Sequence, residues 1–171
     1  PGPVVLALPE DMLSGHVEID DLPAFAAPLS AVAGSSVAAI AQALAGAERP
    51  LVVPGGTLWS QDAADNLARF ARNWGLPVAV PFRRQGHMDN AHANYVGDLG
   101  VGMNPALGRA LEQADCILSL GSRLGDTLTR GYELMNPTRP HARVIHVHPS
   151  PDELGHLWRP DPGLVADPRE L

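Results

Sequence analysis

The chain has 171 residues, and its 12 basic and 19 acidic side chains give a net charge of −7. This length favours one domain with its own core, and 45% hydrophobic with 18% charged residues is typical of a globular protein. The acidity argues against binding to a nucleic-acid backbone, and no apolar run reaches the ~20 residues of a membrane helix. A single cysteine, Cys116, excludes a disulfide framework and a cysteine-based zinc cluster, and we expect it to be a small buried hydrophobe.

The first 34 residues form two stretches. Residues 1–9 contain the apolar run Val4-Val5-Leu6-Ala7-Leu8, which predicts a short buried strand, and residues 10–34 have the composition of a linker. Because the chain opens inside this apolar run without an initiator Met, we expect it to be an excised piece of a longer protein. Without its original sheet, the segment is expected to be disordered, to pack against the core or to pair with another molecule.

After Gly34, apolar residues at helical spacing alternate with nearly continuous apolar runs. Helices are predicted to begin at Ser35 or Ser36, at Ser60, and at Asn104-Pro105, and a capping box is expected at residues 150–153. Gly75 is placed to end the second of these helices. Strands are predicted at 51–53, 77–80, 116–120, 143–148 and 164–166, and residues 82–103 are expected to be loop, with room for a short strand or helix. This alternation predicts an α/β fold, a parallel sheet covered by helices on both faces and joined by right-handed crossovers.

Two glycine turns are predicted at the carboxyl ends of strands, where open parallel sheets bind ligands. Gly55-Gly56 follows the strand at 51–53, and Gly121-Ser122-Arg123 follows the strand at 116–120. Glycines would let a backbone approach a phosphate, and Arg123 could pair with a diphosphate. The alternative interpretation is that these are ordinary tight turns, and that Arg123 forms an ion pair with a carboxylate such as Asp126. The spacing of a dinucleotide fingerprint is missing after Gly55, which disfavours an ordinary NAD dehydrogenase.

His146 and His148 lie two apart on a predicted strand, so both should point to the same face. With His141 or His156 they could bind a metal. The alternative is one packed histidine and one at the end of the strand, and it is favoured because no carboxylate is spaced to complete a metal site.

Several runs, taken in order, resemble the central domain of thiamine-diphosphate-dependent enzymes of the acetolactate synthase type. The runs that carry the resemblance are Arg49-Pro50-Leu51-Val52-Val53-Pro54-Gly55-Gly56, Leu76-Pro77-Val78-Ala79-Val80, Gly86-His87-Met88-Asp89-Asn90-Ala91-His92, Tyr95-Val96-Gly97-Asp98-Leu99-Gly100, Ala114-Asp115-Cys116-Ile117-Leu118-Ser119-Leu120-Gly121-Ser122-Arg123-Leu124 and Ala142-Arg143-Val144-Ile145-His146-Val147. The opening Gly2-Pro3-Val4-Val5-Leu6-Ala7-Leu8-Pro9-Glu10-Asp11 resembles the last strand of the preceding, pyrimidine-binding domain.

The resemblance implies a three-layer Rossmann-like fold of the type that binds NAD or FAD. It divides the chain into residues 1–10 as the end of the pyrimidine-binding domain, 11–34 as linker, 35–166 as central domain and 167–171 as the start of the next linker. It also implies a parent transferase, decarboxylase or lyase that acts on 2-keto acids or related carbonyl compounds, a homodimer or homotetramer with thiamine diphosphate and magnesium. A cytoplasmic location is the default expectation, because the sequence does not open with a Lys/Arg-led signal peptide. The partners of this segment would be the missing pyrimidine-binding and diphosphate-binding domains. No catalytic residue and no metal ligand is carried over, so the isolated chain is expected to have no turnover.

In some relatives of this type the central domain binds FAD or ADP. The matching positions here are Gly55, Gly56, Gly100, Gly121, Ser122 and Arg123. The family's Arg-Phe-Asp-Asp-Arg stretch reads Arg123-Leu124-Gly125-Asp126-Thr127 here, and His148 and Ser150 stand where relatives have acids. A nucleotide-binding module and a ligand-free structural domain therefore remain open alternatives.

Overall fold

Short apolar runs become the strands of one parallel sheet in the computed structural model, which describes residues 3–25, 32–57 and 59–171. The six strands have the order β3-β2-β1-β4-β5-β6, and all neighbouring pairs are parallel. The strands are β1 (Pro50–Pro54), β2 (Val78–Pro81), β3 (Tyr95–Leu99), β4 (Cys116–Leu120), β5 (Arg143–His148) and β6 (Gly163–Val165). The helices are α1 (Glu10–Leu13), α2 (Gly34–Ala45), α3 (Gln61–Trp74), α4 (Pro105–Gln113) and α5 (Asp126–Thr129). Short 3₁₀ turns are η1 (Gln85–His87), η2 (Pro151–Glu153) and η3 (Pro168–Glu170).

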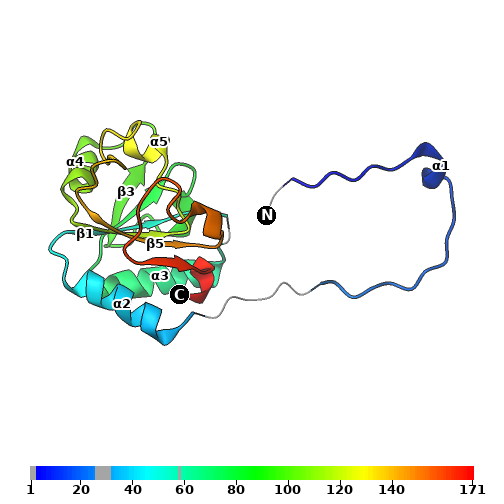
Figure 1. Ribbon diagram of the computed structural model, residues 1–171, viewed down its shortest axis with the longest axis horizontal. Helices are drawn as coiled ribbons and strands as arrows, with labels where there is room; N and C mark the ends of the chain where they lie inside the picture. The colour runs from blue at the N-terminus through cyan, green and yellow to red at the C-terminus, as the bar shows by residue number, and fades with distance from the viewer. Residues whose placement is uncertain (1–2, 26–31, 58) are drawn as a thin grey trace.

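The sheet is covered on both faces, as the continuous apolar strands predict (Figure 1). On one face, α2 and α3 pack with Leu118 of β4 and Ile145 of β5. On the other face, α4 and α5 pack with Ile117 and Val144, the neighbours of those residues along the same strands. Successive side chains of a strand point to opposite faces, so one run of apolar residues supplies both cores. The predicted three-layer α/β fold is confirmed.

Local signals place several helix ends correctly. The Ser60 hydroxyl accepts a hydrogen bond from the backbone N–H of Ala63, 3.2 Å away, and starts α3. Gly75 ends that helix in the left-handed conformation, at φ 65°. Asn104 caps α4 by accepting from the N–H of Ala106 at 2.9 Å. Each of these contacts joins residues close in the chain, which explains why the sequence predicts them.

Two predicted caps were wrong. Helix α2 begins at Gly34, with Ala33 at the cap position and no side-chain cap hydrogen bond, so neither Ser35 nor Ser36 starts it. Ser150 makes no cap hydrogen bond either, and only the single 3₁₀ turn η2 follows it. Residues 154–162, between η2 and β6, form no further helix.

The strand predicted near residues 4–8 does not form within this chain. Residues 3–25 extend away from the sheet with one helical turn, α1, and their apolar side chains are exposed; Val5 is 92% exposed and Leu6 77% (Figure 1). A strand needs a neighbour for its backbone hydrogen bonds, and the described residues 3–25 pair with none of the six strands of the sheet. The predicted strand is therefore wrong for the chain as it stands, and of the outcomes expected without the original sheet, packing against the core is not observed. Residues 26–31 of the predicted linker lie outside the described residues. Among the described residues, no helix has the length and apolar content needed to cross a membrane.

Candidate functional site

The candidate site is a cleft of about 610 Å³ at the carboxyl ends of β1 and β4. Between these strands the order of the sheet reverses, because β2 and β3 lie on one side of β1 while β4 to β6 lie on the other. Such switch points are where open α/β sheets bind ligands. The cleft is lined by Gly55, Gly56, Thr57, Pro81, Phe82, Arg84, Gly121, Ser122, Arg123, Gly125, Asp126, Thr127, Leu128, His148, Pro149 and Pro168.

The two predicted glycine turns lie against each other. A Cβ atom added to Gly55 would lie 2.7 Å from the Cβ of Ser122, and one added to Gly121 would lie 2.7 Å from the carbonyl oxygen of Gly55. The φ angles of Gly56 and Gly121 are +82° and +77°, in the region that favours glycine. Packing of one turn on the other, with no ligand involved, therefore already requires these glycines.

Arg123 makes an ion pair with Glu153 of η2, with its Nη2 atom 2.7 Å from Oε1. Asp126, the partner considered from the sequence, instead accepts a hydrogen bond from the N–H of Thr127 at 2.7 Å. The Arg123 side chain is 73% exposed, so its side of the ion pair faces solvent. The predicted ion pair of Arg123 with a carboxylate is confirmed, but the carboxylate is that of Glu153 and not that of Asp126.

Ser122 is fixed in the cleft by several hydrogen bonds. Its carbonyl oxygen accepts from the Ser119 hydroxyl and faces Nε2 of His146, each at 2.8 Å. A carbonyl only accepts, so Nε2 carries the proton, and the buried Nδ1 has no hydrogen-bond partner. Burial, the largest influence, lowers the pKa of His146 and keeps the ring neutral. These hydrogen bonds tie the turn after β4 to Ser119 of β4 and His146 of β5.

The histidine pair of β5 does not form a metal site. The rings of His146 and His148 are 5.9 Å apart in an edge-on arrangement, and Nδ1 of His148 accepts from the N–H of Ser150 at 3.1 Å. In the described part of the chain, no group of three or more His, Cys, Asp or Glu side chains is arranged to hold a metal ion. The arrangement matches the interpretation of one packed histidine and one at the strand end.

The sequence analysis missed a Trp–His stack that holds the first glycine turn. The rings of Trp59 and His87 stack with centroids 4.7 Å apart. The indole N–H of Trp59 donates to the carbonyl of Gly55 at 2.6 Å, and His87 Nε2 lies 3.2 Å from the carbonyl of Gly56. Burial is the main reason that the pKa of His87 is lowered. His87 was noted only as part of a family-like run, and nothing local pairs it with a residue 28 positions earlier.

Gly100 lies apart from the other five predicted positions. It follows β3, at the edge of the sheet, and lines a separate hollow with Asp126 and Thr127. Beside it, Asp98 and Phe82 lie close to where a Cβ would stand. The sequence placed Gly100 in the loop at 82–103 and grouped it with the other five through the family resemblance alone. In the fold, β2 and β1 separate the end of β3 from the turn after β4.

Comparison with known proteins gives this cleft its context. The family described as "Thiamine pyrophosphate enzyme, central domain" matches residues 37–171. The chain belongs to this family. The acetolactate synthase large subunit of Corynebacterium glutamicum is 28% identical over 177 residues, which cover all of this chain and 28% of that protein. The probable acetolactate synthase large subunit of Methanocaldococcus jannaschii is 27% identical over all of the chain and 30% of its own length. The glyoxylate carboligase of Escherichia coli O157:H7 is 29% identical over 98% of the chain and 28% of its own length.

This central domain therefore spans less than a third of the relatives it matches. The predicted resemblance is confirmed, and thiamine pyrophosphate is the coenzyme of the family as a whole.

The cleft of this central domain fits a nucleotide only in part. Its size, the half-buried Arg84 and the exposed Arg123 would suit a diphosphate, but Arg123 is already paired with Glu153. A ribose needs acceptors for its hydroxyl groups. The carboxylate of Asp126 offers one in the cleft, whereas the acceptor atom of His148 is used by Ser150. The glycines are explained by contacts between the two turns. We therefore derive no chemical step through a nucleotide in this cleft.

Proposed function

We propose that the chain is a scaffold: the central domain of a thiamine-diphosphate-dependent enzyme that forms or cleaves a carbon–carbon bond beside a carbonyl, with 2-keto acids as the substrate class. The family match over residues 37–171 carries this proposal. The printed names of the relatives, acetolactate synthase and glyoxylate carboligase, support a carbonyl substrate.

The architecture suits a scaffold. Two turns at the carboxyl edge are packed without space for a methyl group, and one is fixed from below by Ser119 and His146. Such interlocked turns keep their shape when a neighbouring domain docks on them. The coenzyme supplies the carbanion chemistry when it is bound, and the protein orients and shields it. We assign the coenzyme and its magnesium ion to the domains that flank this one, in a cytoplasmic homodimer or homotetramer.

Calorimetry tests this assignment. The chain of 171 residues is titrated with thiamine diphosphate and Mg²⁺, beside the full polypeptide of the same gene. We expect no saturable heat from the 171-residue chain and micromolar binding by the full polypeptide. Saturable binding by the short chain would place the coenzyme site in the central domain and refute the proposal.

Nucleotides give a second test, which separates a scaffold from a nucleotide-binding module. We expect the melting temperature of the chain to be the same with and without FAD or ADP. A yellow purified protein, or a rise in melting temperature with ADP that the variant Arg123→Ala abolishes, would favour the nucleotide module instead.

A further inference from the structure

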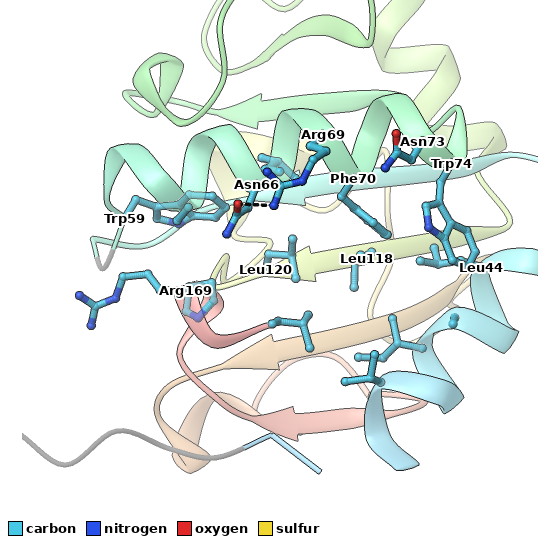
Figure 2. Close-up of a pocket in the computed structure, with 17 residues that line it drawn as sticks. Leu44, Trp59, Asn66, Arg69, Phe70, Asn73, Trp74, Leu118, Leu120 and Arg169 are labelled. Atoms are coloured by element: carbon cyan, nitrogen blue, oxygen red, sulfur yellow. Dashed lines mark hydrogen bonds between the residues drawn. The ribbon is translucent and has the colours of Figure 1, made fainter. Parts of the chain in front are cut away.

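Helix α3 presents Arg69 and Arg72 to different surroundings. Arg69 lines an apolar groove of about 430 Å³ between α2 and α3, where it donates a hydrogen bond to Asn66 at 2.7 Å (Figure 2). Arg72 is in the last turn of α3 and does not line this groove. Its Nη2 atom lies 3.3 Å from Nε2 of His92, in the loop that precedes β3. This contact is near the amino ends of β2 and β3, whereas the cleft is at the carboxyl ends of the strands.

The ring of His92 is held in one orientation. Its Nδ1 atom accepts a hydrogen bond from the backbone N–H of Asn94 at 3.1 Å. The backbone N–H of His92 donates to the carbonyl of Asp89 at 3.0 Å. The carboxamide of Asn94 donates to the carbonyls of Ala71 and Leu76, at 3.1 and 3.0 Å. The loop is therefore fastened to the end of α3, and the ring keeps its position beside that helix.

These contacts determine which ring nitrogen carries the proton. A backbone N–H only donates, so Nδ1 of His92 has no proton, and the proton of the neutral ring is on Nε2. The guanidinium of Arg72 has donors and no acceptor. Two donor nitrogens therefore lie 3.3 Å apart, and neither can accept from the other. Within the described part of the chain, neither side chain has an ion-pair partner.

A missing acceptor explains this arrangement. The C-terminal end of a helix favours a cation, which accounts for Arg72 but not for a second donor beside it. An oxyanion accounts for both, because its oxygens accept from a guanidinium and from an imidazole N–H together. We propose that Arg72 and His92 form a binding site for one small oxyanion. The net charge of −7 opposes an anion only weakly there, since exposed charges are screened beyond about 10 Å at 0.1 M salt.

Nitrogen NMR of the 171-residue chain tests this site. At about pH 8, where an ordinary imidazole is neutral, a long-range nitrogen–proton spectrum should show the proton of His92 on Nε2. Phosphate should shift the Nε2 resonance along a curve that saturates at millimolar concentration, and potassium chloride at the same ionic strength should not. Acetate, in a parallel titration, shows whether a carboxylate occupies the site as well as a phosphate does. A proton on Nδ1, or the absence of saturation with both anions, would overturn the proposal.

Two variants and a matched control show which side chains bind the anion, with the Asn94 amide as the common readout. Arg72→Gln keeps a donor but removes the charge, and should weaken the apparent affinity about tenfold. His92→Asn can still accept from the N–H of Asn94, as Asn does in turns, but it lacks the Nε2–H group and should also weaken binding. Arg69→Gln makes the same charge change on the same helix and should leave the affinity unchanged. Equal weakening by Arg69→Gln and Arg72→Gln would overturn the proposal, because the anion would then respond only to the overall charge. The site is remote from the cleft, so neither result bears on the calorimetric test of the coenzyme assignment.

Discussion

Substitution of Gly55 by alanine separates the two explanations of the glycine turns. If the glycines exist for a ligand, Gly55→Ala leaves the free energy of unfolding unchanged and affects only binding. If they exist for packing between the turns, the substitution destabilises the fold. The added Cβ would lie 2.7 Å from the Cβ of Ser122 and 2.8 Å from its Cα, about 1 Å inside an ordinary carbon–carbon contact.

The contact cannot be relieved by turning a flexible side chain, because the Cα belongs to the backbone of the opposite turn. The turns after β1 and β4 must therefore move apart, against the bonds that Ser119 and His146 make to Ser122. Overpacking of this kind costs about 1–3 kcal/mol, a sizeable part of the ~5–15 kcal/mol that stabilises a typical domain.

Urea unfolding, followed by the fluorescence of the three tryptophans, measures this cost. The midpoint urea concentration should fall, while the dependence of the free energy of unfolding on urea concentration stays the same. Gly86→Ala is the matched control, because a Cβ there meets nothing within 4 Å and its φ lies outside the left-handed region. We expect the control to stay within about 0.5 kcal/mol of the parent chain. A Gly55→Ala variant as stable as Gly86→Ala would refute the packing explanation and favour a ligand as the reason for the glycines.

Three further predictions concern charged and titratable groups. Asp115→Ala should cost about 1 kcal/mol at pH 7, discounted for solvent, because the carboxylate accepts from two backbone N–H groups ahead of β1. Burial raises the pKa of this carboxyl, but the hydrogen bonds outweigh it and lower the pKa; the stabilisation is therefore full above about pH 4 and lost as pH falls through the folded value. Burial lowers the pKa of His146, so the unfolded chain binds a proton more readily than the folded chain, and the free energy of unfolding should fall as pH drops below about 6.5. In urea titrations between pH 5 and 8, His146→Leu should reduce this dependence of the free energy of unfolding on pH. An unchanged pH dependence would exclude His146 as its source. Arg123→Ala should cost less than about 1 kcal/mol by the same assay, since its pair with Glu153 is exposed on the arginine side; a larger loss would mean that the pair holds η2 in place.

The sequence by itself determined the parts of this protein that depend on neighbours in the chain. Ser60, Gly75 and Asn104 mark helix ends through contacts within a few residues, and all three were predicted. The apolar runs gave the strands at 116–120 and 143–148 with their observed bounds. The ordered motifs also identified the family, because they preserve local turns at strand ends.

Only the tertiary structure decided what those turns are for. Gly55 and Gly121 are 66 positions apart, and their need for glycine comes from each other. The stack of Trp59 on His87 and the pair of Arg123 with Glu153 also join segments whose distance depends on strand order. A pattern along the chain reports which face a residue takes, but not which strand lies beside it. The groove between α2 and α3 is the same kind of property, visible once both helices are packed on the sheet.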